Sequence, residues 1–239
     1  MVSVCIATYN GGEMLRTQLA SILPQLSPTD EIVISEDGDL EETRKLVADI
    51  TTVRCVVVEG PRVHSPIYNF ENALRRAKGD IIFLSDQDDK WCEGKVATMC
   101  AALKDCECVC SDCYVTDKAF NITAPSFYGV VGKREGKFFN LLRHNCYLGC
   151  CMAFRRTVLE KALPFPKKLP MHDIWIGNVS AFFYRLRFID DKLILFRRHG
   201  ENASSTAGKS DSSFLQKIQY RYQVIKGLCM ICFRNKRKH

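Results

Sequence analysis

A group of carboxylates directly follows an apolar segment of strand length. Residues 81–85 are mostly apolar, and the next four residues, Asp86-Gln87-Asp88-Asp89, include three acids. In an extended segment residues two apart point to the same side, so we expect Asp86 and Asp88 to face one way. Two such carboxylates repel each other unless a cation lies between them, and Mg²⁺ and Mn²⁺ prefer oxygen ligands that they share with phosphates. The pattern therefore predicts a site for Mn²⁺ or Mg²⁺ that carries a diphosphate.

A sheet must position these acids, because strand-like and helix-like patterns alternate through the first half of the chain. Apolar segments of strand length occupy residues 2–6, 31–35, 53–58 and 81–85. Between them, apolar residues recur at helical spacing. Repeated strand–helix units form a mostly parallel sheet with right-handed crossovers, and ligands bind beyond the carboxyl ends of its strands. We therefore predict an α/β fold in which helices flank a mixed, mostly parallel sheet.

Polar residues stand where three of these strands are expected to end. They are Thr8 with Asn10, Glu36 with Asp37, and Asp86 with Asp88. Because the carboxyl ends of parallel strands meet at one edge of a sheet, we expect the three pairs to converge there. Two of the pairs also have plain structural readings, since Glu36 and Asp37 suit a turn before Gly38, and acids after residue 85 suit the start of a helix. We favour a binding site because the pairs occur together.

The second half of the chain is less regular. Strand patterns occur at residues 108–115, 186–189 and 193–197, and a helix pattern at residues 157–163. Residues 117–135 contain Pro125 and several glycines and have little periodicity, so we predict a long loop, which in a compact domain is usually a lid or a binding loop. Asp173 precedes an apolar stretch, where it suits the cap of a helix as well as a catalytic role.

Composition indicates a globular protein with free thiols. The chain has 239 residues, 46% of them hydrophobic, which is enough for a substantial core. Its 13 cysteines are odd in number and many lie in apolar runs, which favours buried thiols in a reducing compartment. The cluster Cys106, Cys108, Cys110 and Cys113 lacks a second CxxC or a His pair, so we favour a strand over a zinc site. No apolar run is long enough to span a bilayer, and we expect a cytoplasmic protein.

The positive charge lies in the last part of the chain. The eight basic residues and one acid after position 208 account for the whole formal net charge of +7. There, apolar residues recur at helical spacing, and basic residues occupy the opposite face. The apolar positions are Phe214, Ile218, Tyr222, Ile225, Cys229 and Cys232. We predict a domain over 1–208, with halves 1–115 and 116–208, and a tail over 209–239. Residues 214–238 would bind an anionic membrane surface or pack on protein; we expect no nucleic acid partner.

Taken together, these segments resemble the family 2 glycosyltransferases, which have the GT-A (Rossmann-like) fold. The resemblance runs from residue 1 to about residue 205 and rests on the number and order of its motifs. They are Val4-Cys5-Ile6-Ala7-Thr8-Tyr9-Asn10-Gly11, Ser35-Glu36-Asp37-Gly38, Asn69-Phe70, Gly79-Asp80 before Asp86-Gln87-Asp88-Asp89, Gly149-Cys150-Cys151-Met152, His172-Asp173 and Arg198-His199-Gly200-Glu201-Asn202. Two of these motifs, Asp86-Gln87-Asp88-Asp89 and Arg198-His199-Gly200-Glu201-Asn202, are most similar to the rhamnosyltransferase-like branch, which builds bacterial surface polysaccharides.

The resemblance implies a role for each site residue. Thr8 and Asn10, with Glu36 or Asp37, would contact the base and ribose of the nucleotide. Asp86 would contact the ribose or the metal, and Asp88 and His199 would bind the metal. Gly149 and Cys150 would line the sugar pocket, and Asp173 would be the general base. The implied reaction is inverting transfer from a UDP- or dTDP-sugar to a hydroxyl of a glycan or lipid-linked acceptor.

Two other functions stay open at this point. A nucleotidyltransferase shares the nucleotide-first architecture, but such enzymes usually carry a basic residue after a Gly-rich loop, and here Gly11-Gly12 is followed by Glu13. A non-catalytic, membrane-docked nucleotide-binding protein would use the basic tail. The set Asp86, Asp88, Asp173 and His199 favours an enzyme over this last alternative.

Overall fold

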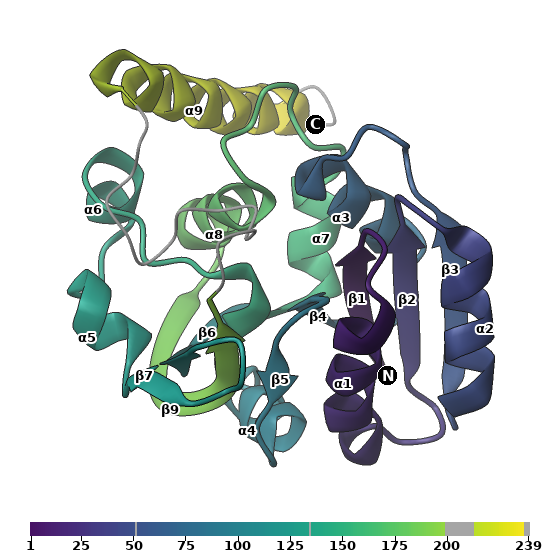
Figure 1. The fold of residues 1–239 in the computed structure, drawn as a ribbon. Helices are drawn as coiled ribbons and strands as arrows, with labels where there is room; N and C mark the ends of the chain where they lie inside the picture. The colour runs from purple at the N-terminus through teal and green to yellow at the C-terminus, as the bar shows by residue number, and fades with distance from the viewer. Residues whose placement is uncertain (51, 134, 199–212, 237–239) are drawn as a thin grey trace.

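The chain is seen in a computed structural model that describes residues 1–50, 52–133, 135–198 and 213–236 (Figure 1). His199, which the sequence predicts as a metal ligand, lies outside the described residues, and so does the rest of its motif after Arg198. The division of the chain between residues 208 and 209 also falls outside them and stays a prediction.

Strands and helices alternate along the chain. The strands are β1 (Val2–Thr8), β2 (Glu31–Glu36), β3 (Arg54–Glu59), β4 (Ile81–Asp86), β5 (Lys90–Trp91), β6 (Cys108–Thr116), β7 (Ile122–Ala124), β8 (Met152–Arg155) and β9 (Leu186–Arg197). The α-helices are α1 (Gly12–Ile22), α2 (Leu40–Ile50), α3 (Pro66–Leu74), α4 (Lys95–Ala102), α5 (Phe127–Val131), α6 (Lys137–Leu142), α7 (Arg156–Ala162), α8 (His172–Phe183) and α9 (Phe214–Lys236). Two 3₁₀ turns, η1 (Leu23–Gln25) and η2 (Gly149–Cys151), complete the described elements.

One mixed sheet runs through the molecule in the order β3-β2-β1-β4-β8-β6-β9-β5, and β7 pairs with β6. The first four strands in this order are parallel, as predicted, whereas β8 is antiparallel to β4 and β6. In the register of the parallel part, Thr8 lies opposite Glu36, and Ala7 lies opposite Asp86. The polar residues that follow β1, β2 and β4 therefore meet at one edge of the sheet.

Helices cover both faces of the sheet, as the alternating side chains of β1 show. Val4 and Ile6 belong to the core on the α1 side, whereas Cys5 belongs to the core on the α3 side with Phe70. The thirteen cysteines are all free, and the four at 106–113 are divided between these two cores. They act as small buried hydrophobes in and beside β6.

The prediction of a long loop over residues 117–135 is wrong, because the segment contains β7 and α5. Asp112 in β6 anchors it by accepting hydrogen bonds from Ser126 Oγ (2.6 Å) and Tyr128 N (3.0 Å). Ser126 also caps α5 by accepting from Gly129 N at 2.9 Å. A helix of five residues is too short to give a periodic pattern. The two strands predicted at 186–197 are likewise one strand, β9.

The C-terminal helix is present as predicted, and the residues that pack it on the core are not the apolar positions named from the sequence. Val224, Leu228 and Ile231 are the residues that pack on the core, and a Cβ on Gly227 would lie 2.7 Å from the ring of Trp175 in α8. Of the predicted apolar positions, Ile218, Tyr222 and Ile225 are exposed instead, at 46%, 58% and 38%. Among the described residues, no helix has the length and apolar character to cross a membrane. The helix α9 thus has one apolar face on the core and a second in solvent.

Candidate active site

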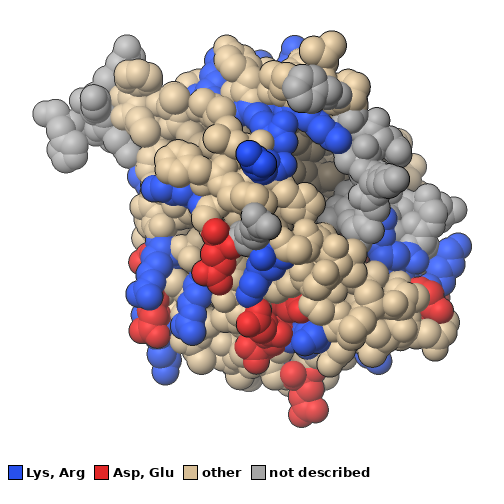
Figure 2. All heavy atoms as spheres, turned by 90° about the vertical axis from the view of Figure 1, so that its left-hand side faces the viewer, with Lys and Arg blue, Asp and Glu red and all other residues tan. Residues whose placement is uncertain are grey.

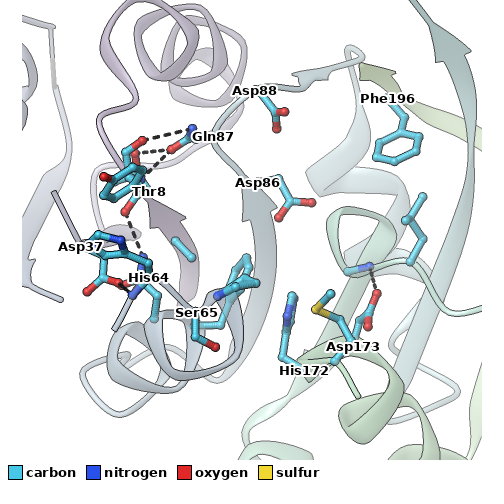
Figure 3. Close-up of a pocket in the computed structure, with 18 residues that line it drawn as sticks. Thr8, Asp37, His64, Ser65, Asp86, Gln87, Asp88, His172, Asp173 and Phe196 are labelled. Atoms are coloured by element: carbon cyan, nitrogen blue, oxygen red, sulfur yellow. Dashed lines mark hydrogen bonds between the residues drawn. The ribbon is translucent and has the colours of Figure 1, made fainter. Parts of the chain in front are cut away.

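A cavity of about 300 Å³ lies beyond the carboxyl ends of β1 and β4, between them and the start of α8 (Figure 3). Its lining includes six of the residues predicted from the sequence: Thr8, Asp37, Asp86, Asp88, Gly149 and Asp173. Asn10, Glu36 and Cys150 are near the cavity but do not line it. The predicted site is therefore assembled in large part at one place, from elements far apart in the sequence.

The loop after β1 is joined to the acidic loop after β4 by Gln87. Its Oε1 accepts hydrogen bonds from Thr8 Oγ1 at 2.6 Å and from Tyr9 N at 2.8 Å. The carbonyl oxygen of Thr8 accepts from Asn69 Nδ2 of α3 at 2.9 Å. The Thr8 side chain is thus held in the cavity wall by a glutamine that the sequence showed only as a spacer between acids.

Glu36 is buried and holds the loops after β1 and β2 together. The side chain is 1% exposed, and its carboxylate accepts from Asn10 N (3.0 Å), Gly38 N (2.7 Å) and Thr43 Oγ1 (2.7 Å). Asn10 Oδ1 in turn accepts from Asp39 N at 2.9 Å, and a Cβ on Gly38 would collide with that oxygen. Both predicted ligands Asn10 and Glu36 therefore have hydrogen-bond partners within the protein.

Asp37, in contrast, lies in the cavity wall. Its carboxylate accepts hydrogen bonds from the backbone N–H groups of Arg62 and His64, the latter at 2.6 Å. A carboxylate has about four lone-pair sites, so two backbone donors leave acceptor capacity for a ligand. Of the two adjacent acids, Asp37 is the one placed to contact a bound molecule.

The acidic loop concentrates negative charge at the cavity. Burial, together with the carboxylates of Asp88 and Asp173, raises the pKa of Asp86 to about 8. Asp89 is fully buried behind it; Oδ1 accepts from Arg197 N at 2.9 Å, and Oδ2 has no partner among the described residues. Burial and the neighbouring Asp88 and Asp86 also raise the pKa of Asp89. A bound cation would relieve this repulsion.

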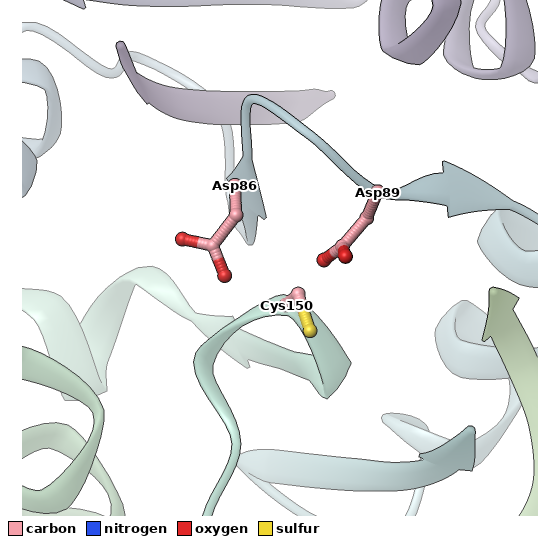
Figure 4. A group of neighbouring side chains, drawn as sticks. All are labelled: Asp86, Asp89 and Cys150. Atoms are coloured by element: carbon pink, nitrogen blue, oxygen red, sulfur yellow. The ribbon is translucent and has the colours of Figure 1, made fainter. Parts of the chain in front are cut away.

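The carboxylates beside the cavity fit a divalent metal. One ligand atom each from Asp86, Asp89 and Cys150 lies within 4.8 Å of the others (Figure 4). A thiol is a poor ligand for Mg²⁺ and Mn²⁺, which favour oxygen. Asp89 is fully buried, whereas Asp86 and Asp88 both line the cavity, where a metal could also contact a diphosphate. These two carboxylates are the better placed pair.

Asp173 occupies the opposite wall, in the first turn of α8. Its Oδ1 accepts from Ile174 N at 2.7 Å and its Oδ2 from Gly149 N at 3.1 Å. Burial raises the pKa of Asp173 to about 6, although these hydrogen bonds act to lower it. The carboxyl group is therefore ionised at neutral pH and more basic than an ordinary aspartate.

The turn η2 is held from below by a buried lysine. Lys95 is fully buried, and its Nζ donates to the carbonyl oxygen of Cys150 at 2.5 Å. Cys150 is itself fully buried, so its side chain lies behind the wall that Gly149 forms. Lys95, Gln87 and Asp89 were not predicted to have roles, because their partners Cys150, Thr8 and Arg197 lie far away in the sequence.

The cavity has Asp86 and Asp88 on one wall and Asp173, of raised pKa, on the other. This arrangement on an α/β fold is compatible with a glycosyltransferase of the GT-A kind. The family model described as glycosyl transferase family 2 matches residues 3–163, and the chain belongs to this family. The prediction of the family is confirmed; the rhamnosyltransferase-like branch stays a prediction.

Individual proteins agree with this assignment. The beta-1,3-glucosyltransferase WfaP of Escherichia coli, named as acting with UDP-Glc on alpha-D-GlcNAc-diphosphoundecaprenol, is 24% identical over a match covering 98% of this chain and 96% of that protein. Among solved structures, S. aureus TarS in complex with UDP-GlcNAc has a TM-score of 0.65 at 14% identity, covering 95% of this chain and 72% of that chain. The mannosyltransferase PcManGT of Pyrobaculum calidifontis, in complex with GDP-Man and Mn²⁺, has a TM-score of 0.59 at 22% identity, covering 80% and 55%. The GT-A fold prediction is confirmed by these likenesses.

Proposed function

We propose that this glycosyltransferase is inverting and metal-dependent, and that it moves a sugar from a UDP- or dTDP-sugar to a hydroxyl of a glycan or lipid-linked acceptor in bacterial surface polysaccharide synthesis. The observation that carries the proposal is the position of Asp173 across the cavity from Asp86 and Asp88. The names of WfaP and of the TarS complex, both of which refer to UDP-sugars, support the class of donor. Rhamnose as the transferred sugar rests on the sequence motifs alone.

Asp37 would select the base. Its carboxylate lies in the cavity wall and keeps lone pairs beyond the two backbone donors that orient it. An imide N–H, which uracil and thymine carry, is a donor that such a carboxylate can accept. Thr8, at the neighbouring strand end, would contact the ribose.

Asp86 and Asp88 would hold Mn²⁺ or Mg²⁺. When bound, the metal neutralises the negative charge that develops on the diphosphate as the glycosidic bond breaks. The PcManGT complex with Mn²⁺ supports this cofactor. His199 remains a proposed further ligand outside the described residues, and a neutral imidazole suits Mn²⁺ better than Mg²⁺.

Asp173 would take the proton from the acceptor hydroxyl as that oxygen attacks the anomeric carbon. Its raised pKa of about 6 places it close to the value at which a general base is most effective at neutral pH. The hydrogen bonds from Gly149 N and Ile174 N fix the orientation of the carboxylate. One displacement from the face opposite the leaving group inverts the anomeric centre.

A panel of nucleotide sugars tests this function. The protein is incubated with each donor, an acceptor mixture and Mn²⁺ or Mg²⁺, and the released product is identified. Release of a nucleoside diphosphate with at least one donor is expected. Release of pyrophosphate would indicate a nucleotidyltransferase instead, and metal-dependent nucleotide binding with no turnover would indicate the non-catalytic alternative.

We also propose that α9 attaches the protein to an anionic membrane surface, on the cytosolic face where nucleotide sugars occur. Its outward face carries large apolar side chains, with Leu215 76%, Tyr222 58% and Phe233 65% exposed. Lys217, Arg221 and Lys226 lie on the same helix, and Figure 2 shows Lys and Arg side chains on the upper part of the molecule, the level that α9 occupies in Figure 1. Apolar side chains beside basic ones suit the interface of an anionic bilayer.

A further inference from the structure

His172 lies in the cavity wall with two unsatisfied polar atoms. Its side chain is only 4% exposed, and neither Nδ1 nor Nε2 has a hydrogen-bond partner among the described residues. Most buried polar side-chain atoms in proteins are hydrogen-bonded, and an unpaired one is destabilising. A buried ring with both nitrogens unpaired, in the wall of a binding cavity, indicates a partner that arrives with the ligand.

The packing around the ring leaves the cavity side open. One face stacks on Phe70 of α3, with ring centroids 4.0 Å apart and 25° between the planes. Next to Nε2 is Gly149, where an added Cβ would lie 2.9 Å from that nitrogen. The missing side chain at Gly149 therefore keeps space free beside this nitrogen. In Figure 3 the ring points from α8 into the cavity, on the side where Asp86 lies.

The chemistry of the ring limits what the partner can be. Burial lowers the pKa of His172 to about 3, so the ring is neutral and offers one N–H donor and one acceptor nitrogen. A diphosphate only accepts hydrogen bonds, whereas a hydroxyl group both donates and accepts. A diphosphate can therefore pair only with the N–H of the ring, whereas a hydroxyl can pair with either nitrogen. In the proposed reaction, sugars bring hydroxyls into the cavity next to the base Asp173.

We propose that His172 binds a sugar hydroxyl through the ring nitrogen that faces Gly149, and that this contact contributes to the specificity of transfer. The inference rests on the proposed function. Both the transferred sugar and the acceptor carry hydroxyls, and the experiment below separates the two sources. Neither the metal nor the nucleotide is part of the contact.

The test compares His172→Phe, which keeps the ring stack on Phe70 and removes both nitrogens, with His172→Gln, which restores a donor and an acceptor. His144→Phe, at an exposed histidine, is the matched control. Each protein is titrated with UDP and with UDP-glucose in Mn²⁺ by calorimetry, and transfer is measured with the donor turned over by the wild type. We expect His172→Phe to lower kcat/KM by roughly 10- to 100-fold at an unchanged Kd for UDP, and His172→Gln to recover part of the loss.

The binding data identify which sugar is recognised. If the hydroxyl belongs to the donor, the gain in affinity of UDP-glucose over UDP falls in His172→Phe; if it belongs to the acceptor, this gain is unchanged and the KM for acceptor rises. Equal kcat/KM in wild type and His172→Phe, or an equal loss of affinity for UDP and UDP-glucose, would overturn the inference while leaving the transferase activity of the wild type intact. A wild type that transfers no sugar would instead overturn the proposed function and this inference with it.

Discussion

At the scale of single residues, Asp173 is held in a defined orientation in the cavity wall. It is buried, it accepts hydrogen bonds from Gly149 N and Ile174 N, and it faces the acids that would hold the metal. Substitution Asp173→Asn keeps the shape and removes the base. We expect transfer to fall about 10²- to 10⁴-fold while donor affinity is unchanged, as measured by product release and calorimetry. Transfer at the wild-type rate would exclude Asp173 as the base.

The pKa of Asp173 gives a pH dependence with a definite sign. Burial raises that pKa to about 6, so the carboxylate is the base above pH 6 and is protonated below it. We expect kcat/KM to be constant near neutral pH and to fall as the pH is lowered through about 6, approaching tenfold per pH unit. The measurement is kcat/KM from pH 5 to 8 at saturating metal. A profile that stays level down to pH 5 would contradict this assignment.

Asp88 is the other residue whose removal has a clear expected effect. Asp88→Ala takes away one of the two carboxylates at the cavity, and we expect the Mn²⁺-dependent part of UDP binding to weaken at least about tenfold. Calorimetry of UDP with and without Mn²⁺ measures this part. Asp105→Ala, at an exposed acid, is the control and should bind as the wild type does. The same Mn²⁺ enhancement in Asp88→Ala as in the control would remove Asp88 from the metal site.

At the scale of elements, α9 combines two apolar faces. Val224, Leu228 and Ile231 pack on the core, whereas Ile218 and Tyr222 are 46% and 58% exposed. We expect the double variant Ile218→Ser/Tyr222→Ser to bind anionic vesicles at least about tenfold more weakly than the wild type, because two apolar side chains no longer enter the interface. Cosedimentation with vesicles of phosphatidylglycerol and phosphatidylcholine measures the binding.

The matched control for α9 is Ile122→Ser, which removes an apolar side chain that is 55% exposed on β7. Point variants are preferable to removal of the helix, because a truncated chain would uncover the buried Trp175. Equal binding by the double variant and the control would reject the membrane proposal and favour a protein partner for this face.

Much of the parallel half of the sheet could be predicted from the sequence, because each buried strand is a short apolar run followed by polar residues. The choice between Glu36 and Asp37 could not, because it depends on backbone N–H groups of Arg62 and His64 that come from the loop after β3. The face by which α9 packs on the core could not be predicted for a similar reason. Two apolar faces compete in that sequence, and the contact between Gly227 and Trp175 of α8 decides between them.

At the scale of the whole molecule, the cavity brings together residues from the parallel part of the sheet and from the start of α8. The ends of β1, β2 and β4 carry the residues proposed for nucleotide and metal, and the start of α8 carries the proposed base. The chain reverses direction between these parts, because β8 runs antiparallel to β4 and β6. In the proposed reaction, the acceptor would approach the anomeric carbon from the side opposite the diphosphate.

The anomeric configuration of the product tests this arrangement most directly. The donor that the wild type turns over is converted with its acceptor, and the coupling constant of the anomeric proton is measured by NMR in donor and product. The account predicts that the transferred sugar has the configuration opposite to that in the donor. A product with the donor's configuration would contradict a single displacement assisted by Asp173 and would require a different mechanism.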